Sequence, residues 1–223
     1  MSAELVELEI VRRAALHLSV LESEGFQVYA PTDFTEITAL VQQTGREHQT
    51  PMMSISRNDF TLGSAIWLFL KVDGKCVGGC AAHFIDLRDE PFDQYLRRTS
   101  KEQYGCKEDP IADIARPVSQ EIRGRLVYLG ELEIHPKYRG KLKTVSAFMR
   151  LLQSISVMKW PDFDWMYAFV PFDHVKLTGR YGFTWQMPYA IRWHQPAPPG
   201  RLDSHWMVAL PKSHFVQLWS SDA

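Results

Sequence analysis

The segment ELEIHPKYRGKLKT, residues 131–144, constrains the fold of this chain more than any other. An apolar strand runs into a sharp turn, and a helical pattern begins where the turn ends. The turn carries no acid and four cations: Lys137, Arg139, Lys141 and Lys143. Unpaired N–H groups and the helix dipole favour anions at such a helix start. The sequence therefore predicts a phosphate-binding turn, with an ordinary solvated run of charge as the alternative.

Composition sets the broad class of protein. The 223 residues are 45% hydrophobic, enough for a packed core in one domain over residues 1–223. A net charge of −1 indicates neither nucleic acid nor an anionic membrane as partner. Three cysteines without a CxxC pair predict neither a disulfide framework nor a metal site. No apolar run reaches membrane-span length, and residues 1–25 are too acidic for a signal peptide, so we expect a cytoplasmic protein.

The first part of the chain predicts a helix followed by a hairpin. Residues 3–22 form a helix with an apolar stripe that packs on the domain or makes a homodimer contact: Leu5, Leu8, Val11, Ala15 and Leu18. A short strand over residues 26–29 precedes a helix that Thr32 or Asp33 caps. Strands over 65–72 and 75–84 meet at Asp73-Gly74, a strong hairpin signal.

The rest of the chain predicts an insertion and then alternating strands and helices. Residues 86–123 are charged and rich in proline, and they read as an insertion before the fourth strand, with one short helix near 92–103. The elements that follow are a strand over 126–134, a helix over 141–158, a strand over 165–170, a short helix over 175–181 capped by Asp173, and strands over 184–193 and 204–210. This order predicts an α/β fold with a mixed, twisted sheet of six or seven strands flanked by helices.

Two motifs in this order resemble the GNAT (N-acetyltransferase) superfamily. LEIHPKYRGK, residues 132–141, looks like the fourth strand and acyl-CoA loop of that family, V-x-P-x-Y-R-G-x-G-x-G/A. RYGF, residues 180–183, is similar to the Y-x-x-x-G-F ending of its last helix. The resemblance covers roughly residues 26–212 and implies a GNAT-like acyl-CoA N-acyltransferase fold. It also implies acetyl-CoA or another acyl-CoA as co-substrate, a small-molecule or peptide amine as acceptor, and no metal.

The resemblance places the cofactor on the loop that joins the fourth strand to the next helix. Its residues there are Ile134, His135, Arg139, Gly140, Lys141, Leu142, Lys143 and Thr144. The backbone N–H of Ile134 is the expected donor to the oxyanion.

Three residues depart from the family pattern. Leu142 and Thr144 stand where small residues are usual, and Thr178 stands where the family has its catalytic tyrosine. These departures leave two alternatives to an acetyltransferase. One is an acyltransferase that uses a long-chain or carrier-protein donor, and the other is a non-catalytic acyl-CoA-binding or regulatory module.

Two carboxylates lie just upstream of the loop. Glu131 and Glu133 occupy the same face of the strand, and Gly130 before them indicates a bulge. A carboxylate here would take the proton of an amine that attacks the thioester directly. Glu131 and Glu133 are therefore the candidate general bases or ammonium-binding groups, and the alternative is that both are solvated or paired with the basic turn.

Overall fold

The computed structural model describes residues 3–46, 49–60 and 63–221, and it divides into two compact units. The first unit draws on the chain up to His83, on Leu129–Asp162 and on residues from Val216 onward. The second unit comprises Phe84–Tyr128 and Phe163–Phe215. Strand β5 contributes residues to both.

The elements are close to those that the sequence predicts. The helices are α1 Ala3–Ser23, α2 Phe34–Gln43, α3 Phe92–Tyr104, α4 Arg116–Glu121, α5 Leu142–Lys159, α6 Val175–Thr178 and α7 Lys212–Ser221, with 3₁₀ turns η1 Pro51–Met53, η2 Pro136–Tyr138 and η3 Phe172–His174. The strands are β1 Gln27–Tyr29, β2 Ala65–Val72, β3 Lys75–Asp86, β4 Ile111–Ile114, β5 Arg125–Ile134, β6 Trp165–Val170, β7 Trp185–Met187, β8 Ile191–Trp193 and β9 Trp206–Pro211.

The hairpin of the first unit confirms the local turn prediction. Strands β2 and β3 pair antiparallel, and Asp73 and Gly74 both have positive φ, at 49° and 76°. Two left-handed residues are what a tight two-residue hairpin turn requires. The register shifts between Leu70 and Lys71, because Val77 of β3 has no partner in the pairing. In the same unit Asp33 caps α2, because its side chain accepts a hydrogen bond from Glu36 N.

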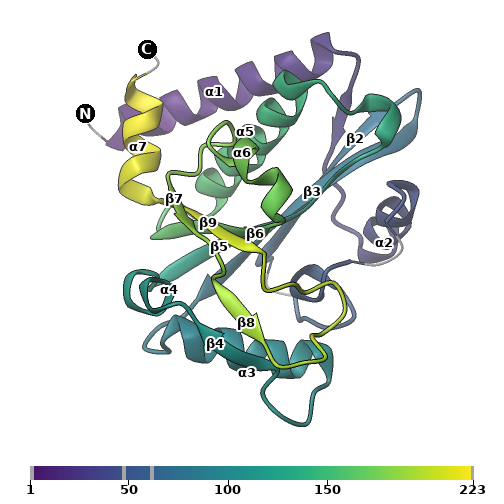
Figure 1. The fold of residues 1–223 in the computed structure, drawn as a ribbon. Helices are drawn as coiled ribbons and strands as arrows, with labels where there is room; N and C mark the ends of the chain where they lie inside the picture. The colour runs from purple at the N-terminus through teal and green to yellow at the C-terminus, as the bar shows by residue number, and fades with distance from the viewer. Residues whose placement is uncertain (1–2, 47–48, 61–62, 222–223) are drawn as a thin grey trace. The chain divides into compact units, whose positions relative to one another are not determined.

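Helix α1 lies alongside α5 in the first unit (Figure 1). Ile10 and Leu21 are buried on its inner face, whereas Leu8 and Val11 of the predicted stripe are 47% and 51% exposed. The prediction that this stripe packs on the domain is therefore wrong, and the side chain of Leu5 lies outside the described residues. The inner face is formed instead by Ile10 and Leu21, with the half-buried His17 between them. A homodimer contact through the exposed stripe stays a prediction.

The second unit differs most from prediction. The insertion holds β4 and α4 in addition to the expected helix, and β4 pairs with β8 in a separate two-stranded sheet. The single strand predicted over 184–193 is wrong, because residues 188–190 interrupt it and Tyr189 has φ of 50°. Asp173 does not cap α6, whose start has no side-chain cap hydrogen bond. Helix α7 was not predicted.

The strand order confirms the predicted fold class. Through β5 the hydrogen-bonded order is β1-β2-β3-β5-β6-β9-β7, seven strands among the described residues. Strand β5 pairs parallel with β6 over Leu126–Tyr128, and β6 and β7 each pair antiparallel with β9. The sheet is therefore mixed. Within the described residues, no helix is both long and apolar enough to cross a membrane.

Candidate functional site

The end of β5 in the first unit carries the two predicted carboxylates in an irregular backbone. Glu131 has φ of 60°, so the backbone departs from ordinary strand geometry at the residue after Gly130, and the bulge expected at Gly130 stays a prediction. A non-glycine residue in this left-handed region is strained, and such strain is typical of functional positions. The side chain of Glu131 is 4% exposed and that of Glu133 is 29% exposed. Glu131 is therefore the buried member of the pair.

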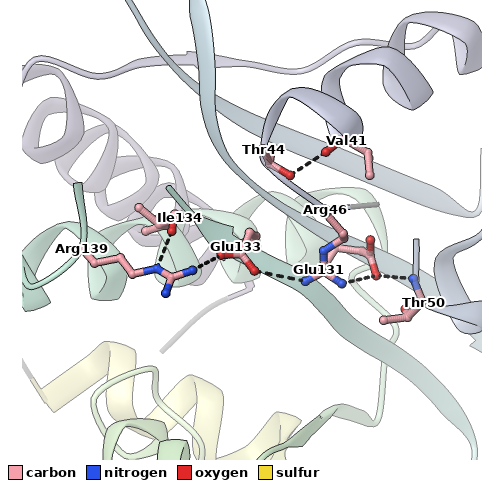
Figure 2. A network of polar contacts seen from close by, with 8 residues as sticks. All are labelled: Val41, Thr44, Arg46, Thr50, Glu131, Glu133, Ile134 and Arg139. Atoms are coloured by element: carbon pink, nitrogen blue, oxygen red, sulfur yellow. Dashed lines mark hydrogen bonds and ion pairs between the residues drawn. The ribbon is translucent and has the colours of Figure 1, made fainter. Parts of the chain in front are cut away.

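Both carboxylates face one guanidinium from the segment that follows α2 (Figure 2). Arg46 Nη1 lies 3.4 Å from Glu131 Oε1, and Arg46 Nη2 lies 3.9 Å from Glu133 Oε2. The backbone N–H of Thr50 donates to Glu131 Oε1 at 2.9 Å. Because a buried carboxylate needs a countercharge and hydrogen bonds, Arg46 and Thr50 explain how Glu131 is accommodated.

Arg139 extends this network to the basic turn (Figure 2). Its Nη2 donates to Glu133 Oε1 at 2.5 Å and its Nε to the carbonyl of Ile134 at 2.6 Å. Positive and negative side chains thus alternate along the series Arg139, Glu133, Arg46 and Glu131. The sequence leaves open that the two carboxylates pair with the basic turn. The structure shows this pairing for Glu133, with Arg139.

A small cavity lies beside Glu131. Its volume is about 10 Å³, and its lining includes Arg46, Trp67 and Glu131. Each of these three residues has a buried polar atom with no hydrogen-bond partner among the described residues: Arg46 Nε, Trp67 Nε1 and Glu131 Oε2. Two donors and one acceptor around a space of this size suit one water molecule.

The basic turn is partly neutralised by acids. Arg139 pairs with Glu133, and Lys141 Nζ lies 2.8 Å from Glu24 Oε2. The hydrogen bond from Lys141 lowers the pKa of Glu24, and the charges of Lys141 and Lys143 lower it further. Helix α5 begins at Leu142 without a side-chain cap, so its first N–H groups are available to an anion.

The predicted cofactor-binding residues of the loop differ in their exposure to solvent. His135, Arg139, Gly140, Lys141 and Lys143 are exposed, Leu142 is half-buried, and Ile134 and Thr144 are buried. Since the Thr144 hydroxyl points into the interior, only its backbone N–H remains for a ligand. In the second unit the buried Thr178 hydroxyl donates to Val175 O at 2.7 Å and accepts from Gln186 Nε2 at 3.0 Å. The Thr178 hydroxyl is therefore hydrogen-bonded within the second unit as both donor and acceptor.

Sequence reasoning missed Arg46 and Thr50. Arg46 and Thr50 lie in a segment without apolar periodicity. They precede Glu131 in the sequence by 85 and 81 residues, yet both contact its side chain in the structure. No local signal marks them. Among the described residues, no group of three or more His, Cys, Asp or Glu side chains could hold a metal ion.

Comparison with known proteins gives structural neighbours only. No family model and no curated protein matches the sequence. One similar structure is an acyl-CoA N-acyltransferase from Pseudomonas aeruginosa, 14% identical, covering 82% of this chain and 98% of that chain with a TM-score of 0.45. Another is FeeM, an N-acyl amino acid synthase from uncultured soil microbes, 14% identical, with coverages of 88% and 94% and a TM-score of 0.45.

A third similar structure is a predicted acetyltransferase with acetyl-CoA from Clostridium acetobutylicum. It is 12% identical, with coverages of 71% and 90% and a TM-score of 0.41.

Proposed function

We propose that this chain is a divergent GNAT-type enzyme that transfers an acyl group, most simply acetyl, from acyl-CoA to a primary amine. One observation carries the proposal: the buried carboxylate of Glu131 lies on β5 directly before a basic turn and the uncapped N-terminus of α5. A proton acceptor and a phosphate-binding element are thus built into one continuous segment of the first unit.

The diphosphate of the cofactor would bind at the start of α5. Backbone N–H groups from Gly140 to Thr144 and the charge of Lys143 would hold it, with the helix dipole adding to the attraction. Arg139 uses Nε and Nη2 on Ile134 and Glu133, so Nη1 is the atom that would reach a phosphate. Leu142 would limit how closely the backbone approaches the diphosphate.

Glu131 is the proposed general base and Glu133 the proposed ammonium-binding group. The amine nitrogen attacks the thioester carbonyl carbon, its proton passes to Glu131 directly or through water, and the C–S bond breaks as the thiolate leaves. The backbone N–H of Ile134 is the proposed donor to the oxyanion. Because a thiol pKa is about 8.5, the thiolate leaves without a strong acid, so the loss of tyrosine at Thr178 does not forbid turnover.

The departures from the family pattern support a second candidate. With the Thr178 hydroxyl committed to other partners and Leu142 in the loop, the same fold would serve as an acyl-CoA-binding module without turnover. A long-chain or carrier-protein thioester as donor is the corresponding variant of the enzyme.

Cofactor binding is tested by thermal unfolding with and without acetyl-CoA. At a ligand concentration one hundred times Kd we expect about 2.7 kcal/mol of added stability. Octanoyl-CoA and an acylated carrier protein test the alternative donors. The absence of any shift with all three thioesters at millimolar concentration would contradict the proposal.

Catalysis is tested by following thiol release with a panel of amines. We expect Glu131→Gln to lower kcat by about 100-fold, the lower range for loss of a general base, with acetyl-CoA binding unchanged. Glu133→Gln is the matched carboxylate control, and we expect it to raise KM for the amine more than it lowers kcat. Binding of acyl-CoA without turnover of any amine would favour the non-catalytic module.

A further inference from the structure

A second cavity of the first unit lies apart from the Glu131 cavity. It has a volume of about 410 Å³ and opens between the start of β3 and the turn η2. Its size falls within the range of about 300–1,000 Å³ that is usual for small-molecule sites. No lining residue is shared with the cavity beside Glu131, so it is a separate site in the same unit.

The floor of this cavity is apolar, and the polar side chains of Gln43 and His135 complete its lining. Cys76 and Val77 of β3 line it and are only 5% and 6% exposed. Burial raises the pKa of the Cys76 thiol, so the side chain is neutral and behaves as a small hydrophobic group. Tyr138 forms a wall and is held edge-on by Phe26 at 5.9 Å and by His135 at 6.1 Å between ring centroids.

The rim of the cavity is positively charged. Lys75 and Lys137 line it, and no acid is among the lining residues. Neither lysine makes an ion pair with any residue that the structure describes, whereas Arg139 and Lys141 nearby are both paired with glutamates. Two unneutralised cations above an apolar floor complement a molecule with an acidic head and an apolar tail.

We propose that this cavity binds a short-chain carboxylate. Its carboxylate lies between Lys75 and Lys137, and its alkyl chain lies on Cys76, Val77 and Tyr138. The chemistry follows from charge complementarity at the rim and from apolar burial at the floor. His135 and Lys137 of the basic turn line this cavity, but the residues proposed to hold the diphosphate, Arg139 and Gly140 to Thr144, do not, so this proposal does not require acyl transfer.

The first test compares three probes by titration calorimetry with the full chain: hexanoate, acetate and hexylamine. Hexanoate should bind about tenfold more tightly than acetate, as expected when about two methylene groups leave water. Hexylamine, which has the same tail and the opposite charge, should show no binding. Equal affinity for hexanoate and acetate would mean that charge alone attracts the ligand, and binding of hexylamine would mean that apolar contact alone does; either result overturns the proposal.

The second test locates the ligand. The Lys75→Gln, Lys137→Gln double variant should lose at least tenfold in hexanoate affinity, whereas the exposed control Lys107→Gln should bind as the unchanged chain does. Full affinity in the double variant would contradict this location.

Discussion

Glu131 concentrates the unusual features of the site in one residue. It is buried, its backbone is left-handed, and its Oε1 accepts from Thr50 while Arg46 supplies the countercharge. Its second oxygen has no partner among the described residues and adjoins a cavity that suits one water. Strain and an unsatisfied acceptor both cost stability, which is the pattern expected where a residue is held for function rather than for folding.

The backbone strain at Glu131 predicts that glycine is a more stable replacement than alanine, the reverse of the usual order within a strand. Glu131→Gly and Glu131→Ala both lose the carboxylate and leave the same partners, so they differ in backbone preference. Since φ of 60° suits glycine, we expect the glycine variant to be more stable by about 0.5–1 kcal/mol. Urea unfolding of both variants measures this difference.

The same pair of substitutions at Leu132 provides the control. Leu132 is on the same strand with an ordinary φ, so alanine should be the more stable replacement there, by about 0.5–1 kcal/mol. Equal or greater stability for Glu131→Ala than for Glu131→Gly would mean that the left-handed conformation is not present in solution.

At the scale of elements, the contact between β3 and β5 positions the site. A Cβ added at Gly78 would lie 2.9 Å from the backbone oxygen of Glu133 and 3.4 Å from Ile134 Cγ1. The two strands must then separate, and overpacking of this kind costs about 1–3 kcal/mol. Gly78→Ala should therefore destabilise the fold and weaken acyl-CoA binding, because it displaces Glu133 and Ile134.

Gly79→Ala is the matched control for that substitution. A Cβ there would meet the Phe69 ring at 3.1 Å, and a side chain gives way more easily than a backbone. Denaturant unfolding of both variants should show a loss at least about 1 kcal/mol larger for Gly78→Ala. Equal losses would indicate that β3 and β5 adjust freely at Gly78.

Elements that depend on neighbouring residues were predicted from the sequence, whereas pairings between distant segments were not. The Asp73-Gly74 hairpin and the Asp33 cap follow from chemistry within a few residues, and both were predicted. The pairing of β4 with β8 joins segments about 80 residues apart, and no local pattern specifies it. Arg46 escaped prediction for the same reason. At the candidate site, the sequence therefore predicts the carboxylates and the basic turn but gives no sign of Arg46 and Thr50, which contact Glu131.

At the scale of the whole molecule, the two compact units do not correspond to two consecutive stretches of the chain. Each unit is assembled from discontinuous segments, and β5 passes from one to the other at Tyr128. Composition gives no sign of such a division, because no linker separates the segments. The single domain predicted over residues 1–223 stays a prediction.

The stability of the molecule should depend on pH through two half-buried histidines. Burial lowers the pKa of His83 on β3 to about 4, and its ring packs edge-on against Phe60 at 4.9 Å. Burial and two arginines, Arg150 and Arg13, lower the pKa of His17 on α1 to about 4 as well. In the unfolded chain both groups bind a proton near pH 6.5. The unfolded state therefore binds more protons between pH 6.5 and 4, and stability falls as the pH falls through that window.

Substitution of His83 isolates one part of this dependence. From pH 7 to pH 5 the histidine should cost the unchanged protein about 1–2 kcal/mol of unfolding free energy, because the neutral form must be kept in the fold. His83→Gln has no imidazole to protonate, so it does not incur this cost. Between pH 7 and pH 5 the unfolding free energy of the variant should therefore fall by about 1–2 kcal/mol less than that of the unchanged protein, whatever its stability at pH 7. Urea unfolding at several pH values measures both slopes, with His194→Gln at an exposed histidine as the control. Parallel curves for the unchanged protein and His83→Gln would mean that His83 does not stay neutral in the folded state.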